Sequence, residues 1–305
     1  MQTNLASSEE IYFHRELVAY SLERRRVDLI TITDHTNKTD NTEPFIKGLF
    51  PEAKNRKTCV RGKIFKKPTI FFSARVHPGE VAASFVLNGI LKIITDPESE
   101  YGKILRRSFV FKIIPLLNPD GVYRGYFRLD TKGRNLNRFY KDAKRSEQPT
   151  IYASKCILKQ QKEISKLALY IDIHAHASRR GCFMFGNALP ILNQQIENMS
   201  LPKMISLNSI DFDFNQCSFA ESNMNVKDKT TGMTRDGCGR VAIWKETGII
   251  NSYTLECHYC IGVNKNKLTD IVNVHSNEVV QKAEDDKEQT STELVSSGTH
   301  DYPYI

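Results

Sequence analysis

Seven runs of apolar, largely β-branched residues are the feature that most constrains what this chain can fold into. Runs of this length, bounded by turn residues, are typical of buried strands. They are Val27–Thr33, Thr69–Val76, Phe109–Leu117, Leu167–His176, Cys182–Gly186, Val241–Lys245 and Ser252–Cys257. Helical patterns lie between several of them, at Val81–Thr95 and Tyr152–Leu167. Strands that alternate with helices predict an α/β domain with a mostly parallel or mixed sheet.

The remaining segments carry weaker patterns. Residues 34–57 and 215–238 indicate surface loops. From about Leu268 the apolar pattern fades, and residues 281–300 are polar and charged, a composition that favours disorder. We therefore expect one domain over residues 1–268 and a polar, disordered tail over 269–305. No closing amphipathic helix follows the last strand, so we expect this domain to be incomplete.

Composition narrows the class of partner. The chain has 305 residues, a net charge of +8 and seven cysteines, and it shows neither a secretory signal nor an apolar run long enough to cross a membrane. An odd number of cysteines fits a reducing compartment, which predicts the cytosol. The basic clusters are short and scattered without interleaved aromatic residues, so we expect no nucleic-acid or membrane partner. An acidic protein substrate remains compatible with the charge.

The segment Arg75-Val76-His77-Pro78-Gly79-Glu80 stands where a strand ends and a helix begins. Pro78 and Gly79 favour a sharp bend, across which His77 and Glu80 can converge on one metal ion. Such a pair is common by chance, and a catalytic zinc site needs a third protein ligand. The end of the strand Leu167–His176 offers candidates, because Asp172, His174 and His176 share one face. Open α/β sheets place their sites at such carboxyl ends.

A hydrolytic zinc site also needs a general base and a cation for the oxyanion. Glu256 is a carboxylate at the end of the otherwise apolar strand Ser252–Cys257. Arg128 and Arg138 flank Asn135-Leu136-Asn137, and an arginine beside an amide can bind a carboxylate in a bidentate manner.

Together these motifs resemble the zinc metallocarboxypeptidase family, and within it the cytosolic carboxypeptidases. The matching segments cover residues 11–262 in order: FFSARVHPGEVAASFVLNGIL, FVFKIIPLLNPDGVYRGYFRLDTKGRNLNR, DIHAHASRRGCFMFGN, SLNSIDFDF and GRVAIWKETGIINSYTLEC. The resemblance implies a mixed-sheet α/β/α sandwich that is truncated at both ends. It also implies one catalytic zinc ion and exopeptidase activity.

The resemblance assigns roles to individual residues. His77, Glu80 and His174 match the zinc ligands, and Glu256 matches the base that activates the zinc-bound water. Arg128 matches the arginine that polarises the scissile carbonyl. Asn137 and Arg138 match the pair that binds the terminal carboxylate of the substrate.

The chain departs from the digestive enzymes of the family in two places. Asn135 stands where they have an aspartate, and it can still accept a hydrogen bond from a zinc-ligating histidine. The loop that carries their mobile tyrosine looks shortened between Trp244 and Tyr253, so no tyrosine is assigned.

The substrate side-chain pocket is expected along Gly239–Lys245, where Arg240 and Lys245 supply cations. On a regular strand these two face opposite sides, so at most one should line the pocket. A cation there suits a glutamate side chain. The resemblance implies removal of C-terminal and branch-point glutamates from polyglutamylated protein tails, with tubulin as the expected substrate. It further implies a cytosolic location. Association with microtubules and a nuclear location are both compatible with the resemblance.

Three other interpretations remain open. A zinc amidohydrolase of N-acyl amino acids would share the three ligands, but the NPDG, NLNR and SYTLE segments favour the peptidase. A non-catalytic binder of acidic tubulin tails would retain zinc without turnover. Cys257 and Cys260 form a lone Cys-x-x-Cys pair, which is weak evidence for a second metal or redox site.

Overall fold

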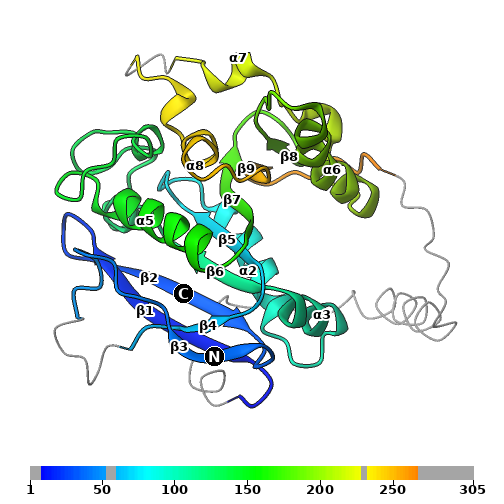
Figure 1. The fold of residues 1–305 in the computed structure, drawn as a ribbon. Helices are drawn as coiled ribbons and strands as arrows, with labels where there is room; N and C mark the ends of the chain where they lie inside the picture. Colours follow the sequence, from blue (N-terminus) through cyan, green and yellow to red (C-terminus); the bar gives the residue numbers. More distant parts are fainter. Residues whose placement is uncertain (1–7, 53–59, 228–231, 267–305) are drawn as a thin grey trace, which may run out of the picture. The chain divides into compact units, whose positions relative to one another are not determined.

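A seven-stranded mixed sheet forms the centre of the computed structural model, which describes residues 8–52, 60–227 and 232–266 (Figure 1). The strand order is β1-β2-β6-β5-β7-β9-β8. The strands are β1 (Tyr12–Tyr20), β2 (Arg26–Thr33), β5 (Thr69–Ala74), β6 (Val110–Ile114), β7 (Leu167–His176), β8 (Cys182–Phe185) and β9 (Ser252–His258). The central strands β6, β5, β7 and β9 are parallel, and the outer pairs are antiparallel. The tail expected over 269–305 lies outside the described residues.

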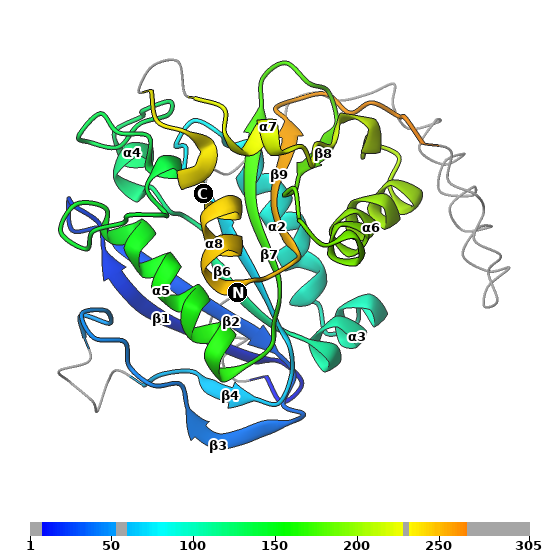
Figure 2. The same cartoon turned by 45° about the horizontal axis from the view of Figure 1, so that its top comes forward.

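Helices cover both faces of this sheet because its central strands alternate apolar side chains between two cores. Ile70 and Phe72 of β5 pack in one core with α2 (Ala82–Ile94), α3 (Glu100–Ser108) and α6 (Leu192–Asn208). Phe71 lies in the other core with α5 (Pro149–Ile164) and α8 (Gly239–Thr247). Figure 2 shows the sheet between these two layers. The predicted mixed-sheet α/β/α architecture is confirmed.

One predicted strand is wrong: residues 241–245 belong to the helix α8. Short apolar runs fit a buried helix as well as a strand. Val241, Ala242 and Ile243 are consecutive and all buried, so the helical period is not visible over this run. Gly248 ends it in the left-handed conformation (φ 71°), with its N–H donating to the carbonyl of Trp244.

Several elements fall in segments without a predicted structure. A small sheet pairs β3 (Lys38–Thr42) with β4 (Lys63–Phe65). The segment 215–238 is not a plain loop, because it holds the short helix α7 (Glu221–Met224) and the 3-10 turn η3 (Arg235–Gly237). Strand β1 and the helices α3 and α6 were also not predicted.

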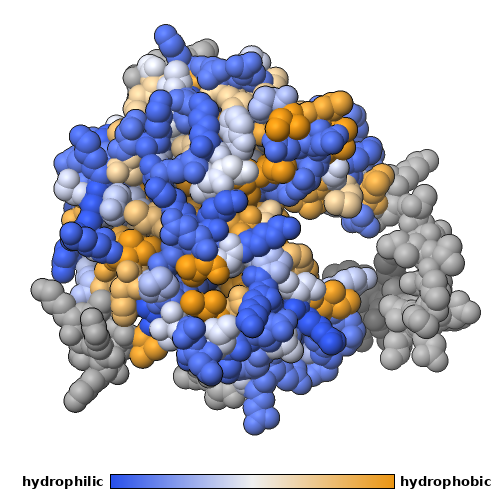
Figure 3. Space-filling model, viewed as in Figure 1, coloured by the Kyte–Doolittle hydropathy of each residue, from blue (hydrophilic) through white to orange (hydrophobic). Residues whose placement is uncertain are grey.

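The surface seen in Figure 3 is largely hydrophilic, and apolar side chains gather over α6. Exposed residues of this helix include Leu192, Ile196 and Leu207. Within the described ranges, no helix has both the length and the apolar character required to cross a membrane.

The strand order reverses direction at β5. The connection from β5 leads to β6 on one side, and the connection from β6 leads back to β7 on the other side of β5. The carboxyl ends of β5 and β7 therefore form a topological switch point, where open α/β sheets bind ligands.

Candidate active site

A cavity of about 290 Å³ opens at this switch point. Its walls include the residues that follow β5, the ends of β7 and β9, and parts of η3 and α8. Every site residue predicted from the sequence lines it except Lys245.

The first wall is formed by His77, Glu80 and His174, called here the ligand trio. Their potential ligand atoms lie within 4.8 Å of one another, and all three residues are buried. Nδ1 of His77 lies 2.7 Å from Oε1 of Glu80, and Nδ1 of His174 lies 2.8 Å from Oε2 of Glu80. Among the described residues this is the one His/Cys/Asp/Glu group with metal-binding spacing.

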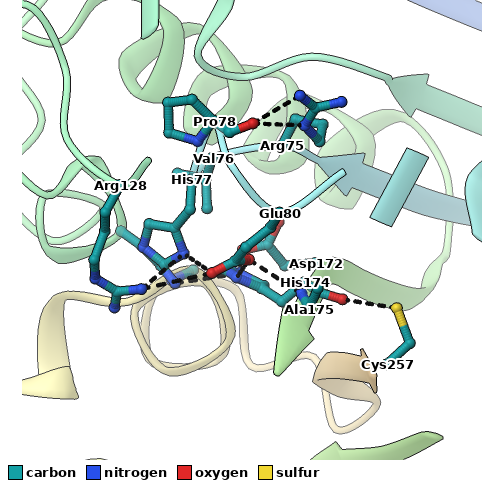
Figure 4. A network of polar contacts seen from close by, with 12 residues as sticks. Arg75, Val76, His77, Pro78, Glu80, Arg128, Asp172, His174, Ala175 and Cys257 are labelled. Atoms are coloured by element: carbon teal, nitrogen blue, oxygen red, sulfur yellow. Dashed lines mark hydrogen bonds and ion pairs between the residues drawn. The ribbon is translucent and has the colours of Figure 1, made fainter. Parts of the chain in front are cut away.

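The far ring nitrogens of both histidines already have partners. Nε2 of His77 lies 3.0 Å from Oδ1 of Asn135, and Nε2 of His174 lies 2.8 Å from Oδ2 of Asp172. Both acceptors favour a proton on Nε2, which leaves the two Nδ1 atoms to face the carboxylate of Glu80. Figure 4 shows Glu80 with His77 and His174. Two imidazoles oriented in this way around a buried carboxylate fit a zinc ion.

The charges of the trio are strongly coupled. Burial alone would raise the pKa of Glu80, but His174 and His77 hold it well below its usual range. Burial lowers the pKa of His77. It opposes protonation of His174 too, yet the carboxylates of Asp172 and Glu80 raise the pKa of His174 well above its ordinary value. This negative environment favours a cation at the site, whether a proton or a metal ion.

A tight bend between β5 and α2 places His77 and Glu80. Arg75 adopts a left-handed backbone conformation (φ 59°), which is strained for a residue other than glycine. Its guanidinium donates to the carbonyl of Pro78 from Nε at 3.2 Å and from Nη2 at 2.7 Å, so it fixes the bend from inside (Figure 4).

Gly79 lets a second loop approach this bend. Its N–H donates to the carbonyl of Phe127 at 2.8 Å, and a Cβ at this position would lie 2.7 Å from the Phe127 ring. Only glycine fits there without displacing Phe127. The contact brings the next residue, Arg128, to the ligand trio, with its Nη1 3.5 Å from Oε1 of Glu80.

Glu256 lies beside the trio on β9, in register with His174 of β7. It lines the cavity, and burial within the surrounding walls raises its pKa to about 7. His174 acts in the opposite direction, and Glu80 adds to the increase. A carboxyl group with this pKa can exchange a proton near neutral pH, as a general base requires.

Asn137 and Arg138 lie on the 3-10 turn η1 (Leu136–Arg138). Oδ1 of Asn137 accepts from the N–H of Gly239 at 3.0 Å, which turns its amide nitrogen towards Nε2 of His174, 3.3 Å away. Nη1 of Arg138 donates to the carbonyl of Asn137 at 2.7 Å. Both side chains line the cavity and offer donors, as binding of a carboxylate requires.

The two candidate pocket cations separate. Arg240, near the start of α8, is 2% exposed and lines the cavity. Lys245 is absent from the walls and pairs instead with Asp236 on the outside. At most one of them lines the pocket, as expected, but the reason differs. Both residues lie on a helix, and side chains five residues apart on a helix point in different directions.

Sequence reasoning missed several wall residues. Arg235 comes from the segment 215–238, and Tyr259 follows β9. Gly237 allows η3 to lie against Arg138, since a Cβ there would meet the Arg138 carbonyl at 2.1 Å. The only local sequence signal for this part of the wall was Arg235, two residues before Gly237.

Cys257 and Cys260 do not form a second metal site. Cys257 is buried and donates from Sγ to the carbonyl of His174 at 3.2 Å, whereas Cys260 is exposed. Neither belongs to the metal-binding group found among the described residues.

Comparisons with known proteins identify the family and the fold of this chain. The profile of the zinc carboxypeptidase family matches residues 2–146. Cytosolic carboxypeptidase-like protein 5 of Ailuropoda melanoleuca is 36% identical over 353 positions, covering 87% of this chain and 39% of the relative. The Homo sapiens protein of that name gives the same identity and coverage. Because 353 positions exceed the 305 residues here, the alignment includes residues that this chain lacks.

Solved structures show the same fold. A metallo-carboxypeptidase from Burkholderia cenocepacia superposes with a TM-score of 0.60 at 21% identity, covering 81% of this chain and 55% of that one. One from Pseudomonas aeruginosa gives 0.58 at 16% identity, with 84% and 58% covered. The chain spans about two fifths of the length of the curated relatives it matches. The chain belongs to the zinc carboxypeptidase family and, by sequence, is similar to its cytosolic carboxypeptidases.

Proposed function

We propose that this chain is a zinc-dependent carboxypeptidase that removes glutamates from the C-termini and branch points of polyglutamylated proteins, tubulin among them. The observation that carries the proposal is the content of one cavity. The ligand trio, a carboxyl group with a pKa raised to about 7 and the arginines Arg128, Arg138 and Arg240 all line it. We assign this activity to the unit within residues 1–268.

Zinc would be held by Nδ1 of His77, the carboxylate of Glu80 and Nδ1 of His174, and when bound it supplies Lewis-acid activation. Glu256 takes a proton from the attacking water at its carboxylate and returns it to the leaving nitrogen. Arg128 stabilises the negative charge that develops on the scissile carbonyl oxygen. Its side chain is 40% exposed, so it can adjust to a substrate.

The α-carboxylate of the terminal residue binds to Arg138 and the amide nitrogen of Asn137. This requirement selects the free C-terminus and makes the enzyme an exopeptidase. The substrate side chain then extends towards Arg240, whose buried charge favours an acidic residue over an apolar or basic one.

The proposed substrate class agrees with the charge of the whole chain. A net charge of +8 increases the rate of encounter with polyanionic tails. The similar proteins are named cytosolic carboxypeptidases, and we extend the cytosolic location to this chain.

Matched peptides that end in Glu, Gln, Leu or Lys test the proposal with zinc-loaded protein. Release of Glu should be fastest, and the same peptide with an amidated C-terminus should resist cleavage. Arg240→Gln should reduce the preference for Glu over Gln, whereas Lys245→Gln, which removes a charge outside the cavity, should preserve it.

Three results would overturn the proposal. Equal release of Leu and Glu would exclude an acidic pocket. Zinc content without release of any residue would favour the non-catalytic binder. Hydrolysis of N-acyl amino acids, with peptides left intact, would favour the amidohydrolase.

A further inference from the structure

Two cysteines face each other across the strands β8 and β9. Cys182 and Cys257 are partners in the antiparallel register of these strands. Residues directly opposite each other in an antiparallel pair project their side chains from the same face of the sheet. Both cysteines accordingly pack in one small cluster at the start of α2, together with Ala82 and Ala175. The sheet therefore holds the two thiols side by side.

Backbone hydrogen bonds show how close the two cysteines lie. The N–H of Cys182 donates to the carbonyl of Asp211 at 2.7 Å, and the carbonyl of Cys182 accepts from the N–H of Asp213 at 2.8 Å. Both backbone groups thus point away from β9, so Cys182 and Cys257 form a non-hydrogen-bonded pair. The Cα atoms of such pairs lie about 4.5 Å apart. A disulfide spans about 4.4–6.8 Å between Cα atoms, so this pair is within its reach.

The two thiols differ in access to solvent. Cys257 is buried and donates from Sγ to the carbonyl of His174 at 3.2 Å (Figure 4). Cys182 is half-buried on β8, the last strand in the sheet order. Burial raises the pKa of both thiols, that of Cys257 to about 12, so both are protonated at neutral pH. An oxidant from solvent therefore reaches Cys182 first.

We infer that Cys182 and Cys257 are a redox-modification site, at which a peroxide converts the two thiols into a disulfide that joins β8 to β9. The peroxide first transfers an oxygen to the sulfur of Cys182, which gives a sulfenic acid and one water. The thiol of Cys257 then displaces the hydroxyl group as a second water, and the S–S bond forms. Two electrons pass from the thiols to the peroxide, and a thiol reductant such as glutathione returns them.

The two cysteines bracket one wall of the cavity. The connection from β8 to β9 contains α6, α7, η3 and α8, and it supplies Arg235 and Arg240 to the wall. A disulfide would close this connection into a loop, which restricts the unfolded chain and stabilises the folded one. It would also remove the S–H group that donates to the carbonyl of His174. Oxidation would thus affect the cavity without modifying any residue that lines it.

The other cysteines nearby are placed less well for this reaction. Cys260 is exposed and lies beyond the end of β9, whereas Cys257 points into the cluster at α2. Cys217 accepts a hydrogen bond at Sγ from the N–H of Met184 at 3.2 Å. Neither Cys217 nor Cys260 stands opposite another cysteine in the strand pairing of the described residues.

Peptide mapping of the oxidised full-length chain tests the linkage. Reduced protein is treated with hydrogen peroxide, its remaining thiols are blocked with iodoacetamide, and it is digested without reductant. Mass spectrometry should identify the peptides of Cys182 and Cys257 joined with the loss of two hydrogens, and dithiothreitol should separate them. Cys182→Ser should abolish this species. Cys156→Ser, which removes a half-buried cysteine of α5, should form it as the wild type does.

Thermal unfolding provides a second measurement that requires no turnover. Oxidation should raise the midpoint temperature of the wild type by about 5 °C or more, the order expected for a disulfide that closes a long loop. The same treatment should not raise the midpoint of Cys182→Ser. Glu256→Gln should show both the linkage and the rise, because the inference does not depend on the proposed function. Circular dichroism before oxidation would verify that each variant is folded.

Three results would contradict the inference. The first is a linkage of Cys257 to Cys260 or Cys217 in place of Cys182. The second is accumulation of sulfinic acid at Cys182 with the thiol of Cys257 still free. The third is a Cys182–Cys257 linkage that lowers the midpoint temperature, because the pair would then be too strained to join the strands in the folded state.

Discussion

The ligand trio and two arginines, Arg235 and Arg240 (the arginine pair), line one cavity, yet they are constructed in opposite ways. The trio lies at the ends of two parallel strands, and its histidines have hydrogen-bond partners at both ring nitrogens. The arginine pair lies on connections between β8 and β9 and shares one neutral acceptor. The trio centres on a carboxylate, whereas the pair consists of two cations.

This difference indicates that metal binding and substrate selection depend on different parts of the fold. The proposed metal ligands come from strand β7 and from the bend that directly follows β5, so the sheet positions them. The proposed substrate-selecting arginines come from a turn and a short helix, where substitutions can alter the pocket without moving the proposed ligands. Variants in the trio should therefore abolish activity, and variants in the pair should redirect it.

The largest effect is expected from the trio. His77→Ala or Glu80→Ala should remove both zinc and activity, because two remaining ligands hold the ion poorly. Metal analysis by mass spectrometry measures the first loss. His176→Ala, a cavity histidine on the same strand face as His174, should retain full zinc and serves as the control. Full zinc in both trio variants would refute the ligand assignment.

A smaller effect is expected at Glu256. Glu256→Gln should retain zinc and reduce kcat by at least about 10²-fold, the range for a positioned base. In the wild type, kcat/KM should rise with pH, because Glu256 accepts a proton only when ionised. Its pKa is about 7 without metal, and a bound dication favours the ionised form. The acidic limb should therefore lie at or below about that pH. A near-normal kcat in the variant would assign the proton transfer to another group.

The arginines on the trio side of the cavity should give effects no larger than that of Glu256, and these should differ in kind. Arg128→Ala should lower kcat by roughly 10²-fold, because it removes stabilisation of the oxyanion. Arg138→Ala should mainly raise KM, because it removes α-carboxylate binding. Steady-state kinetics on one peptide distinguishes the two. Lys132→Ala, which removes an exposed charge from the same region, is the control. Identical changes in kcat and KM for both arginines would contradict their separate roles.

The same comparison explains what could be predicted from the sequence. The sheet and the trio were predictable because apolar strands end in polar residues whose spacing is local, as in His77 and Glu80. The cluster of Asn223, Arg235 and Arg240 was not predictable, because these residues follow no periodic pattern and meet only through tertiary packing. The helix α8 was mistaken for a strand because its first five residues are all buried. Gly248, a helix-ending residue, was the signal that favoured the correct interpretation.

One pairing within the sheet has a consequence for the evolution of the site. His174 and Glu256 are direct neighbours in the β7–β9 ladder, so strand pairing fixes the backbone spacing between the proposed metal ligand and the proposed base. The long connection between them, which contains β8, α6, α7 and α8, does not influence that spacing. Residues can be added to or deleted from it while the catalytic separation stays constant. Substitutions in this connection can thus change substrate preference while the proposed catalytic groups keep their spacing.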